Sequence, residues 1–219
     1  MVKNNIKNAC LVVIGNEILT GRTQDKNINH VAKEFFKVGI LLNYVCVIPD
    51  IQKIIVKEIR RLKKDFDYVI TTGGIGPTHD DITAESISIA VDREYKLHQG
   101  AFKELIKYYK KIKSELTDAR KKMAYMPSGS KLIKNKISGA PGFNIENIYV
   151  FAGIPSIVEA MMREFVKSIK NKNKFYSSSI ITKLFESKIA NILRYNPNRR
   201  GQANKCAVAY ICLDYNPVT

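Results

Sequence analysis

A glycine-rich stretch between an expected strand and an expected helix constrains the fold of this chain more than any other segment. The stretch, residues 71–83, reads TTGGIGPTHDDIT, and it follows directly from the β-branched run at residues 68–72. Residues 84–90 then have the spacing of a helix. A strand, a glycine turn and a helix in this order indicate a βα unit of a parallel sheet. Bare backbone N–H groups in such a turn can closely approach an anion.

The loop therefore predicts a site for phosphate and a divalent cation. The expected phosphate-binding residues of this loop are Gly73, Gly74, Gly76, Thr78 and Thr83. Two adjacent carboxylates, Asp80 and Asp81, suit a hydrated cation such as Mg²⁺ that would offset the phosphate charge. The structural alternative is an ordinary tight turn in which Asp81 or Thr83 only caps the next helix. The loop has neither the Lys-Ser/Thr ending of a P-loop nor the glycine spacing of a dinucleotide fingerprint.

Composition indicates a cytoplasmic protein with one main domain and an appendage. The chain has 219 residues, of which 45% are hydrophobic, and it has no apolar stretch long enough to span a bilayer. The N-terminal residues are polar, and we expect neither a signal peptide nor a membrane partner. No C-x-x-C motif links the four cysteines, which are expected to be buried thiols: Cys10, Cys46, Cys206 and Cys212.

The net charge of +16 does not by itself indicate a nucleic-acid partner. The basic excess is mostly Lys, and its densest segment, residues 103–122, is predicted to form one helix. The lysines would occupy the solvated face of that helix. Its apolar stripe is expected to consist of Leu105, Ile106, Tyr109, Ile112 and Leu116. The positive field would attract an anionic small molecule, and we rank nucleic-acid binding last.

Strands and helices alternate along the first two thirds of the chain, which predicts a parallel α/β sheet. Helices are expected from Asp25, from Asp50 as an N-cap, and after Pro155; the strands are expected at residues 9–14, 40–48, 68–72 and 148–151. Ligands of such sheets bind beyond the carboxyl ends of the strands. Three loops should therefore meet at one edge: residues 15–21, 49–50 and 73–83. Residues 138–143 could form a second rim.

These segments resemble, in this order, the MoCF (MoaB/Mog-like molybdopterin-binding) domain family. The branch they are most similar to is the N-terminal domain of competence/damage-inducible CinA proteins and of eukaryotic FAD synthases. The likeness covers roughly residues 6–170. It rests on IGNEILTG at 14–21, Asp25, Asn27, Pro49-Asp50, TGGIGPTHDD at 72–81, GAPGF at 139–143 and AGIPS at 152–156.

The resemblance implies a three-layer α/β/α sandwich around a mostly parallel sheet. It also implies that Asp50 and Asp81 are catalytic and metal-binding, with Asp80 and Glu17 as weaker candidates. Gly15, Gly139, Pro141 and Gly142 complete the expected substrate-binding set. Known members bind molybdopterin and adenylylate it, or hydrolyse the pyrophosphate of ADP-ribose or FAD with a divalent metal. The cofactor expected here is a divalent metal, Mg²⁺ or else Mn²⁺ or Co²⁺. Relatives assemble as dimers or trimers, so a homo-oligomer is expected.

We therefore expect metal-dependent hydrolysis of a nucleotide pyrophosphate with release of AMP. The alternatives are binding of a pterin phosphate without turnover, and adenylylation of molybdopterin. The sequence leaves the choice among ADP-ribose, FAD and molybdopterin open.

Two departures from the family pattern stand out. Ala152 occupies a position where many relatives have proline. The tail, residues 175–219, begins like the second domain of CinA at residues 185–190 and then diverges. It is expected to be a small α+β remnant with strands at 177–182 and 205–213 and a short helix at 186–193. We expect neither an amidase domain nor deamidase activity.

Overall fold

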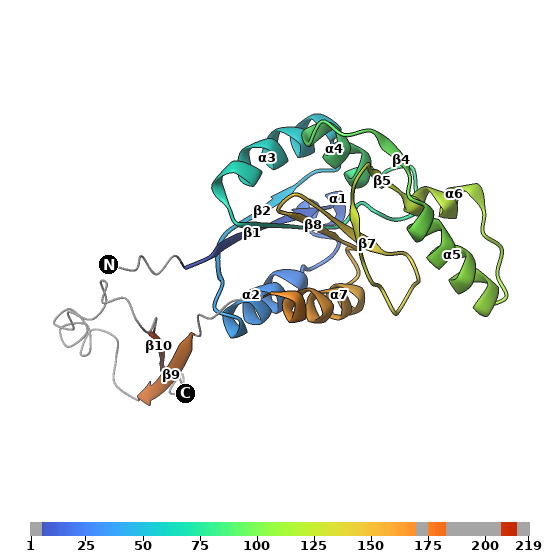
Figure 1. Cartoon of the computed structure of the whole chain (residues 1–219). Helices are drawn as coiled ribbons and strands as arrows, with labels where there is room; N and C mark the ends of the chain where they lie inside the picture. The colour runs from blue at the N-terminus through green and yellow to red at the C-terminus, as the bar shows by residue number, and fades with distance from the viewer. Residues whose placement is uncertain (1–5, 170–174, 183–206, 214–219) are drawn as a thin grey trace.

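The main domain is built on a six-stranded, mostly parallel sheet. The computed structural model describes residues 6–169, 175–182 and 207–213. The strand order is β2-β1-β3-β8-β7-β6 (Figure 1). The first four strands of that order are parallel, and β7 and β6 each run antiparallel to the preceding neighbour. Their bounds are β1 Asn8–Ile14, β2 Leu41–Ile48, β3 Tyr68–Thr72, β6 Lys131–Ile133, β7 Gly142–Ile145 and β8 Ile148–Phe151.

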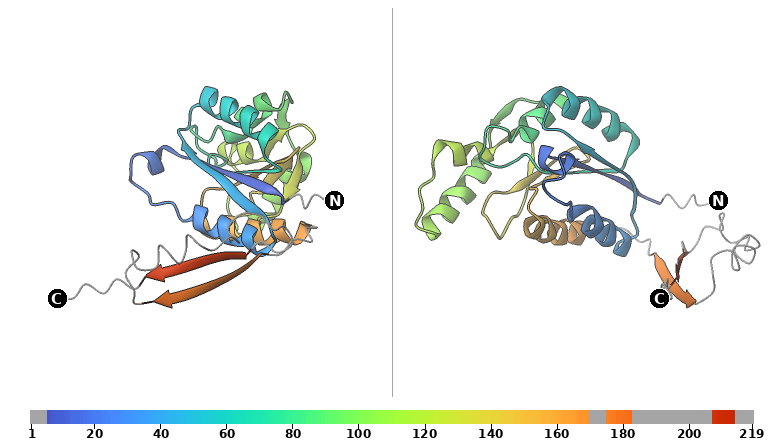
Figure 2. Two further views of the ribbon diagram at one scale, coloured as in Figure 1. Left: turned by 90° about the vertical axis from the view of Figure 1, so that its left-hand side faces the viewer. Right: turned by 180° about the vertical axis from the view of Figure 1, so that it is seen from behind.

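Helices cover both faces of this sheet, which confirms the predicted three layers (Figures 1 and 2). On one face lie α2 (Asn27–Lys37) and α7 (Pro155–Ser168), and on the other lie α3 (Gln52–Asp65) and α4 (Thr83–Ala90). Alternate residues of β1 supply the two cores: Leu11 and Val13 pack with α2 and α7, whereas Cys10 and Val12 pack with α3 and α4. Because both faces are buried, the strand has to be continuously apolar.

The order of the first three strands creates a crevice at the sheet edge. From β1 the chain passes through α2 to β2, and α3 then carries it back past β1 to β3. The two connections therefore cover opposite faces of the sheet. The chain that leaves β1 leads to β2 on one side, and the chain that leaves β3 leads through α4 toward β6, β7 and β8 on the other side. Open α/β sheets bind their ligands at such a switch point.

An excursion between α4 and β6 departs from the predicted single helix at residues 103–122. It contains β4 (Tyr95–Leu97), α5 (Gln99–Lys111), α6 (Asp118–Lys121), the 3₁₀ turn η1 (Lys122–Ala124) and β5 (Tyr125–Pro127). The helix ends at Lys111, and Lys113 adopts a left-handed φ of 51°, which turns the chain back. Leu105 and Tyr109 are buried as predicted, but Ile106 and Ile112 are 44% and 47% exposed. The predicted stripe was too wide because α5 packs on the domain over a narrow face only.

The described part of the tail is a pair of parallel strands, β9 (Tyr176–Thr182) and β10 (Ala207–Leu213). These match the two strands predicted there, whereas the predicted helix at 186–193 lies outside the described residues. Cys10 and Cys46 are free thiols, the first buried and the second half-buried. Cys206 and the side chain of Cys212 lie outside the described part. None of the helices described is long and apolar enough to cross a membrane.

Candidate functional site

The glycine loop after β3 lies directly against the end of β1. Gly73 has a φ of +101°, and a β-carbon there would lie 2.1 Å from the carbonyl oxygen of Ile14. Its N–H donates to the carbonyl oxygen of Phe151 at the end of β8. A β-carbon on Gly153, just after β8, would come within 3.3 Å of Gly73 Cα. Three parallel strands thus end together around a glycine that no other residue can replace without moving backbone.

The loop continues into α4 without a side-chain cap. Gly74, at φ +66°, accepts a hydrogen bond of 2.9 Å from the N–H of Thr83, the first residue of α4. The N-cap residue is Ile82, so the alternative in which Asp81 or Thr83 caps this helix is wrong. The Thr83 hydroxyl is fully buried beneath Gly74 and has no hydrogen-bond partner among the described residues. Thr83 therefore supports the loop from below, and its role in phosphate binding stays a prediction.

Asp81 is held inside its own loop. Its Oδ2 atom accepts from the backbone N–H of Thr78 at 2.8 Å and from the Thr78 hydroxyl. The same carboxylate lies over Gly76, where a β-carbon would be 2.6 Å from Oδ2. Asp80 is exposed, and the neighbouring Thr78 hydroxyl is the main cause that lowers its pKa. Both carboxylates are thus anchored by one threonine.

Asp50 reaches across from the end of β2 to the end of β1. Its Oδ2 atom accepts a hydrogen bond of 2.8 Å from the backbone N–H of Asn16, the first residue of α1 (Asn16–Leu19). The prediction that Asp50 caps the following helix is wrong, because α3 begins at Gln52 with Ile51 at the N-cap. The carboxylate is drawn away from α3 because α1 offers it an unpaired N–H.

Three neighbouring carboxylates act on Asp50 at this edge. Burial raises the pKa of Asp50, the Asn16 N–H opposes that shift, and the charges of Glu17, Asp80 and Asp81 raise the pKa further. Glu17 folds back over Gly15, where a β-carbon would lie 2.7 Å from each of its carboxylate oxygens. The predicted convergence of the three loops is thus seen in the structure. Among the described residues, however, no three acidic, His or Cys side chains are close enough together to hold a metal ion.

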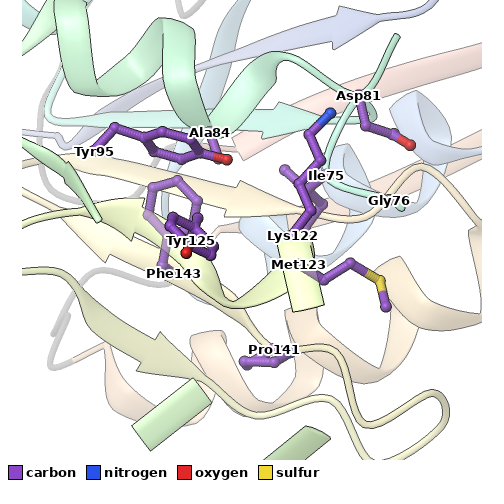
Figure 3. Close-up of a pocket in the computed structure, with 10 residues that line it drawn as sticks. All are labelled: Ile75, Gly76, Asp81, Ala84, Tyr95, Lys122, Met123, Tyr125, Pro141 and Phe143. Atoms are coloured by element: carbon purple, nitrogen blue, oxygen red, sulfur yellow. The ribbon is translucent and has the colours of Figure 1, made fainter. Parts of the chain in front are cut away.

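Lys122, which sequence reasoning did not single out, also lies at this site. Its Nζ atom donates to the carbonyl oxygen of Thr78 at 2.7 Å. With Ile75, Gly76 and Asp81 it lines a small cavity beside the glycine loop (Figure 3). At about 10 Å³ this cavity has room for barely one water molecule. The only sequence signal was a lysine within a basic run, and that run looked like an ordinary solvated face.

The residues of the second predicted rim, 138–143, lie in two different environments: one in β7 and one beside α5. Gly142 is buried in β7, where a β-carbon would lie 2.3 Å from the carbonyl oxygen of Val150. This position gives it a packing role against β8, and its contact with phosphate stays a prediction. Gly139, with φ +70°, lies against the ring of Tyr108 on α5. Pro141 lines both the small cavity and a larger cleft beside α5.

The fold and the site define a class: an open α/β domain with a glycine loop and carboxylates at its switch point. Residues 10–171 match the family described as a probable molybdopterin binding domain. The chain belongs to this family.

Three relatives illustrate the likeness. A protein of Archaeoglobus fulgidus is 32% identical over 192 residues, which are 86% of this chain and 81% of that one. A CinA-like protein of Thermosipho melanesiensis is 31% identical over 81% of this chain, which spans 45% of that longer protein. The crystal structure of CinA from Thermoplasma acidophilum, described as having unknown function, has a TM-score of 0.68 and 29% identity. The match covers 74% of this chain and 98% of that one. The comparison supports the CinA-like branch.

Proposed function

We propose that this protein hydrolyses a nucleotide pyrophosphate of the ADP-ribose or FAD class and releases AMP, with a divalent cation as cofactor. The observation that carries the proposal is the position of Asp50. Its half-buried carboxylate accepts a hydrogen bond from the Asn16 N–H. The charges of Glu17, Asp80 and Asp81 raise the pKa of this carboxyl group. A half-buried acid whose pKa is raised by burial and by neighbouring carboxylates is costly in a purely structural role, and such groups are common at functional sites.

The donor set fits Mg²⁺ better than a metal that needs a complete protein cage. All candidate ligands are carboxylate oxygens, which hard cations prefer, and no three of the described side chains form a ready cluster. Mg²⁺ keeps several waters and binds through one or two carboxylates together with substrate phosphates. Asp50 and Asp81 would hold it, with Asp80 as a further ligand. When bound, the cation would neutralise charge on the phosphoryl oxygens.

Residues of the chain itself would bind the phosphates and orient the attacking water. The N–H groups of Gly73, Gly74 and Gly76 would donate to non-bridging phosphate oxygens and stabilise charge that grows as the bond breaks. Asp50, fixed by Asn16, would orient the attacking water. Lys122 would place its ammonium group beside the leaving phosphate, since its Nζ atom is already anchored on the glycine loop at Thr78.

The experiment is an AMP-release assay on the full chain. With Mg²⁺, Mn²⁺ or Co²⁺ the protein should release AMP from FAD or ADP-ribose, and Asp81→Ala should abolish this release. Retention of wild-type activity by Asp81→Ala would remove the assignment. Omission of the cation, with EDTA present, should also abolish it.

A second candidate is suggested by the family description, which names molybdopterin binding. In this alternative the glycine loop captures a pterin phosphate, either without turnover or for adenylylation. Calorimetry with a pterin phosphate would then show binding, while no AMP would form from FAD or ADP-ribose. Adenylylation would be detected as consumption of ATP in the presence of the pterin.

We also propose a homo-oligomer, a dimer or trimer. Exposed isoleucines on and after α5, Ile106 and Ile112, and the edge strand β2 with its exposed Val45, support this proposal. Light scattering on the purified chain tests it, and a monomer at micromolar concentration would overturn it.

A further inference from the structure

A cleft beside α5 lies outside the glycine-loop site. It has a volume of about 340 Å³, within the usual range for small-molecule pockets, and it lies between α5 and the loop of residues 134–141. Tyr108, Leu132 and Pro141 give it apolar walls. Lys107, Lys111, Lys134 and Lys136 also line it, against a single acidic residue, Glu104.

Three of these lysines have no carboxylate partner in the part of the chain that the structure describes. Only Lys136 forms an ion pair, with Glu164 at 3.2 Å. Unpaired ammonium groups gathered around one cleft repel each other, and an anion placed between them would relieve this repulsion. The charged rim therefore selects an anionic ligand, and the apolar walls select one with a ring.

The loop that forms one wall of the cleft is ordered in advance. The Asn135 side chain donates to the Ser138 hydroxyl and to the carbonyl oxygen of Ala140, and it accepts from the N–H groups of Ile137 and Ser138. Gly139 brings the loop against Tyr108, since a β-carbon there would lie 2.3 Å from the ring. The cleft is thus a built feature, and little ordering is needed before a ligand binds.

The topology puts the cleft on the same sheet edge as the glycine loop. Strand β6 ends at Ile133 and runs in the direction of the parallel strands, and the antiparallel β7 starts at Gly142. The intervening loop therefore lies at the carboxyl end of the parallel strands. Pro141 lines both this cleft and the small cavity that contains Asp81 and Lys122. In Figures 1 and 2 the loop, coloured yellow, lies next to α5 at one end of the domain.

We propose that this cleft binds the ring-bearing, phosphorylated half of the substrate, a planar heteroaromatic group of the flavin or pterin phosphate kind. The inference rests on the proposed function, because it places the other phosphate at the glycine loop. It also makes a choice of substrate: a bare ribose phosphate would leave the apolar walls unfilled, so the cleft favours FAD over ADP-ribose. Gly139 and Pro141 then shape the ring site and do not hold the pyrophosphate.

The test is calorimetry of the full chain with FMN and with a pterin phosphate as separate probes, and with ribose 5-phosphate and AMP as comparisons. The test variant is Lys107→Glu/Lys134→Glu, which reverses two charges in the cleft. The matched control is Lys103→Glu/Lys110→Glu, which reverses two exposed charges on the same helix that do not line the cleft. Both variants change the net charge by the same amount, so only the location of the change differs.

We expect at least one ring-bearing probe to bind the wild type, and the cleft variant to weaken it roughly tenfold or more. The control variant should keep the affinity, and AMP should bind both variants alike. Which probe binds decides between a flavin and a pterin. Equal weakening by the two variants, equal binding of ribose 5-phosphate, or no binding of either ring probe at millimolar concentration would overturn the cleft assignment.

The experiments distinguish a wrong cleft assignment from a wrong proposed function. AMP release from FAD that is lost in Asp81→Ala but equal in the two lysine variants, at every substrate concentration, would leave the function and remove the cleft. FMN binding that depends on Lys107 and Lys134, with no AMP release from any nucleotide, would leave the cleft and remove the pyrophosphatase.

Discussion

The Asp50 carboxylate accepts a 2.8 Å hydrogen bond from the backbone N–H of Asn16, which joins the ends of β2 and β1. This bond fixes a half-buried acid at the sheet edge and leaves its other oxygen without a partner among the described residues. The charges that raise its pKa are those of other carboxylates, and within the described part of the chain no ion pair offsets its burial. In the proposed function, this acid would receive a cation or orient an attacking water.

The first prediction concerns Asp50→Asn. The amide oxygen can still accept from Asn16, so the fold should be kept, but the negative charge is lost. We expect AMP release to fall by about 100-fold or more, the size of effect expected when a positioned catalytic group is removed. The rate of AMP formation from FAD at saturating Mg²⁺ is the measurement.

Asp92→Asn is the matched control for that variant. Asp92 is an exposed acid paired with Arg60 at 2.9 Å, remote from the glycine loop, and its φ of 54° suits asparagine. The rate of AMP release by Asp92→Asn should be within twofold of the wild-type rate. A comparable loss in both variants would show that Asp50 acts only through general charge or stability.

Asp50→Asn should also stabilise the folded protein. The pKa of Asp50 lies above its ordinary value of 3.8 in the folded state, so the ionised carboxylate is disfavoured there. The ionised carboxylate lowers the free energy of unfolding. This loss is absent below pH 3.8, the ordinary pKa that applies in the unfolded chain, grows as the pH rises toward and through the folded-state pKa, and is complete at neutral pH. Asp50→Asn should therefore raise the Tm at pH 7 in EDTA, and this gain should shrink to nothing in acid. Millimolar Mg²⁺ should raise the Tm of the wild type but not that of the variant. A variant less stable than the wild type at pH 7 would contradict this reading.

A third prediction separates backbone strain from steric contact in two glycines. Gly73 and Gly21 both have positive φ, +101° and +72°. A β-carbon on Gly21 would meet nothing within 4 Å, whereas one on Gly73 would lie 2.1 Å from the Ile14 carbonyl oxygen. Gly21→Ala should cost about 1–2 kcal/mol from the left-handed backbone alone. Gly73→Ala should cost at least about 2 kcal/mol more, because a main-chain atom has to move. Urea denaturation gives both free energies of unfolding, and equal losses would refute the close packing of this loop on β1.

The sequence predicts the parallel part of the fold well because β1 and β3 are unambiguous. A strand buried on both faces has to be apolar throughout, and the glycines that follow β3 mark where it ends. The short strands β4, β5 and β6 have three residues each, too few to produce a detectable period of alternation. The end of α5 was missed because Lys113 takes its left-handed turn without a glycine to signal it.

The sequence predicts where the candidate site lies on the sheet, but it does not predict which hydrogen bonds its side chains form. Asp50 and the glycine loop follow from the topology, since parallel strands end at one edge. The partner of Asp50 does not follow, because an acid after a strand can cap the next helix or reach sideways to a neighbouring loop, and only the distance to Asn16 decides. Lys122 was hidden for a similar reason. Its contact with Thr78 spans 44 positions and depends on how the excursion folds back.

The last prediction concerns Lys122→Met, which keeps the aliphatic length of the side chain and removes the ammonium group. The Lys122 Nζ atom lies 2.7 Å from the Thr78 carbonyl oxygen and lines the same cavity as Asp81, so a phosphate at the loop would be within its reach. We expect KM for FAD to rise and kcat to fall, with a combined loss of about tenfold to 100-fold in kcat/KM. The exposed Lys103→Met, from the same basic segment, should leave both constants within twofold of the wild type. Lys122→Arg should recover part of the loss, since it restores a donor and a positive charge at the same place. If Lys122→Met and Lys103→Met behave alike, the lysine serves only to hold the loop, and the leaving phosphate is neutralised by other groups.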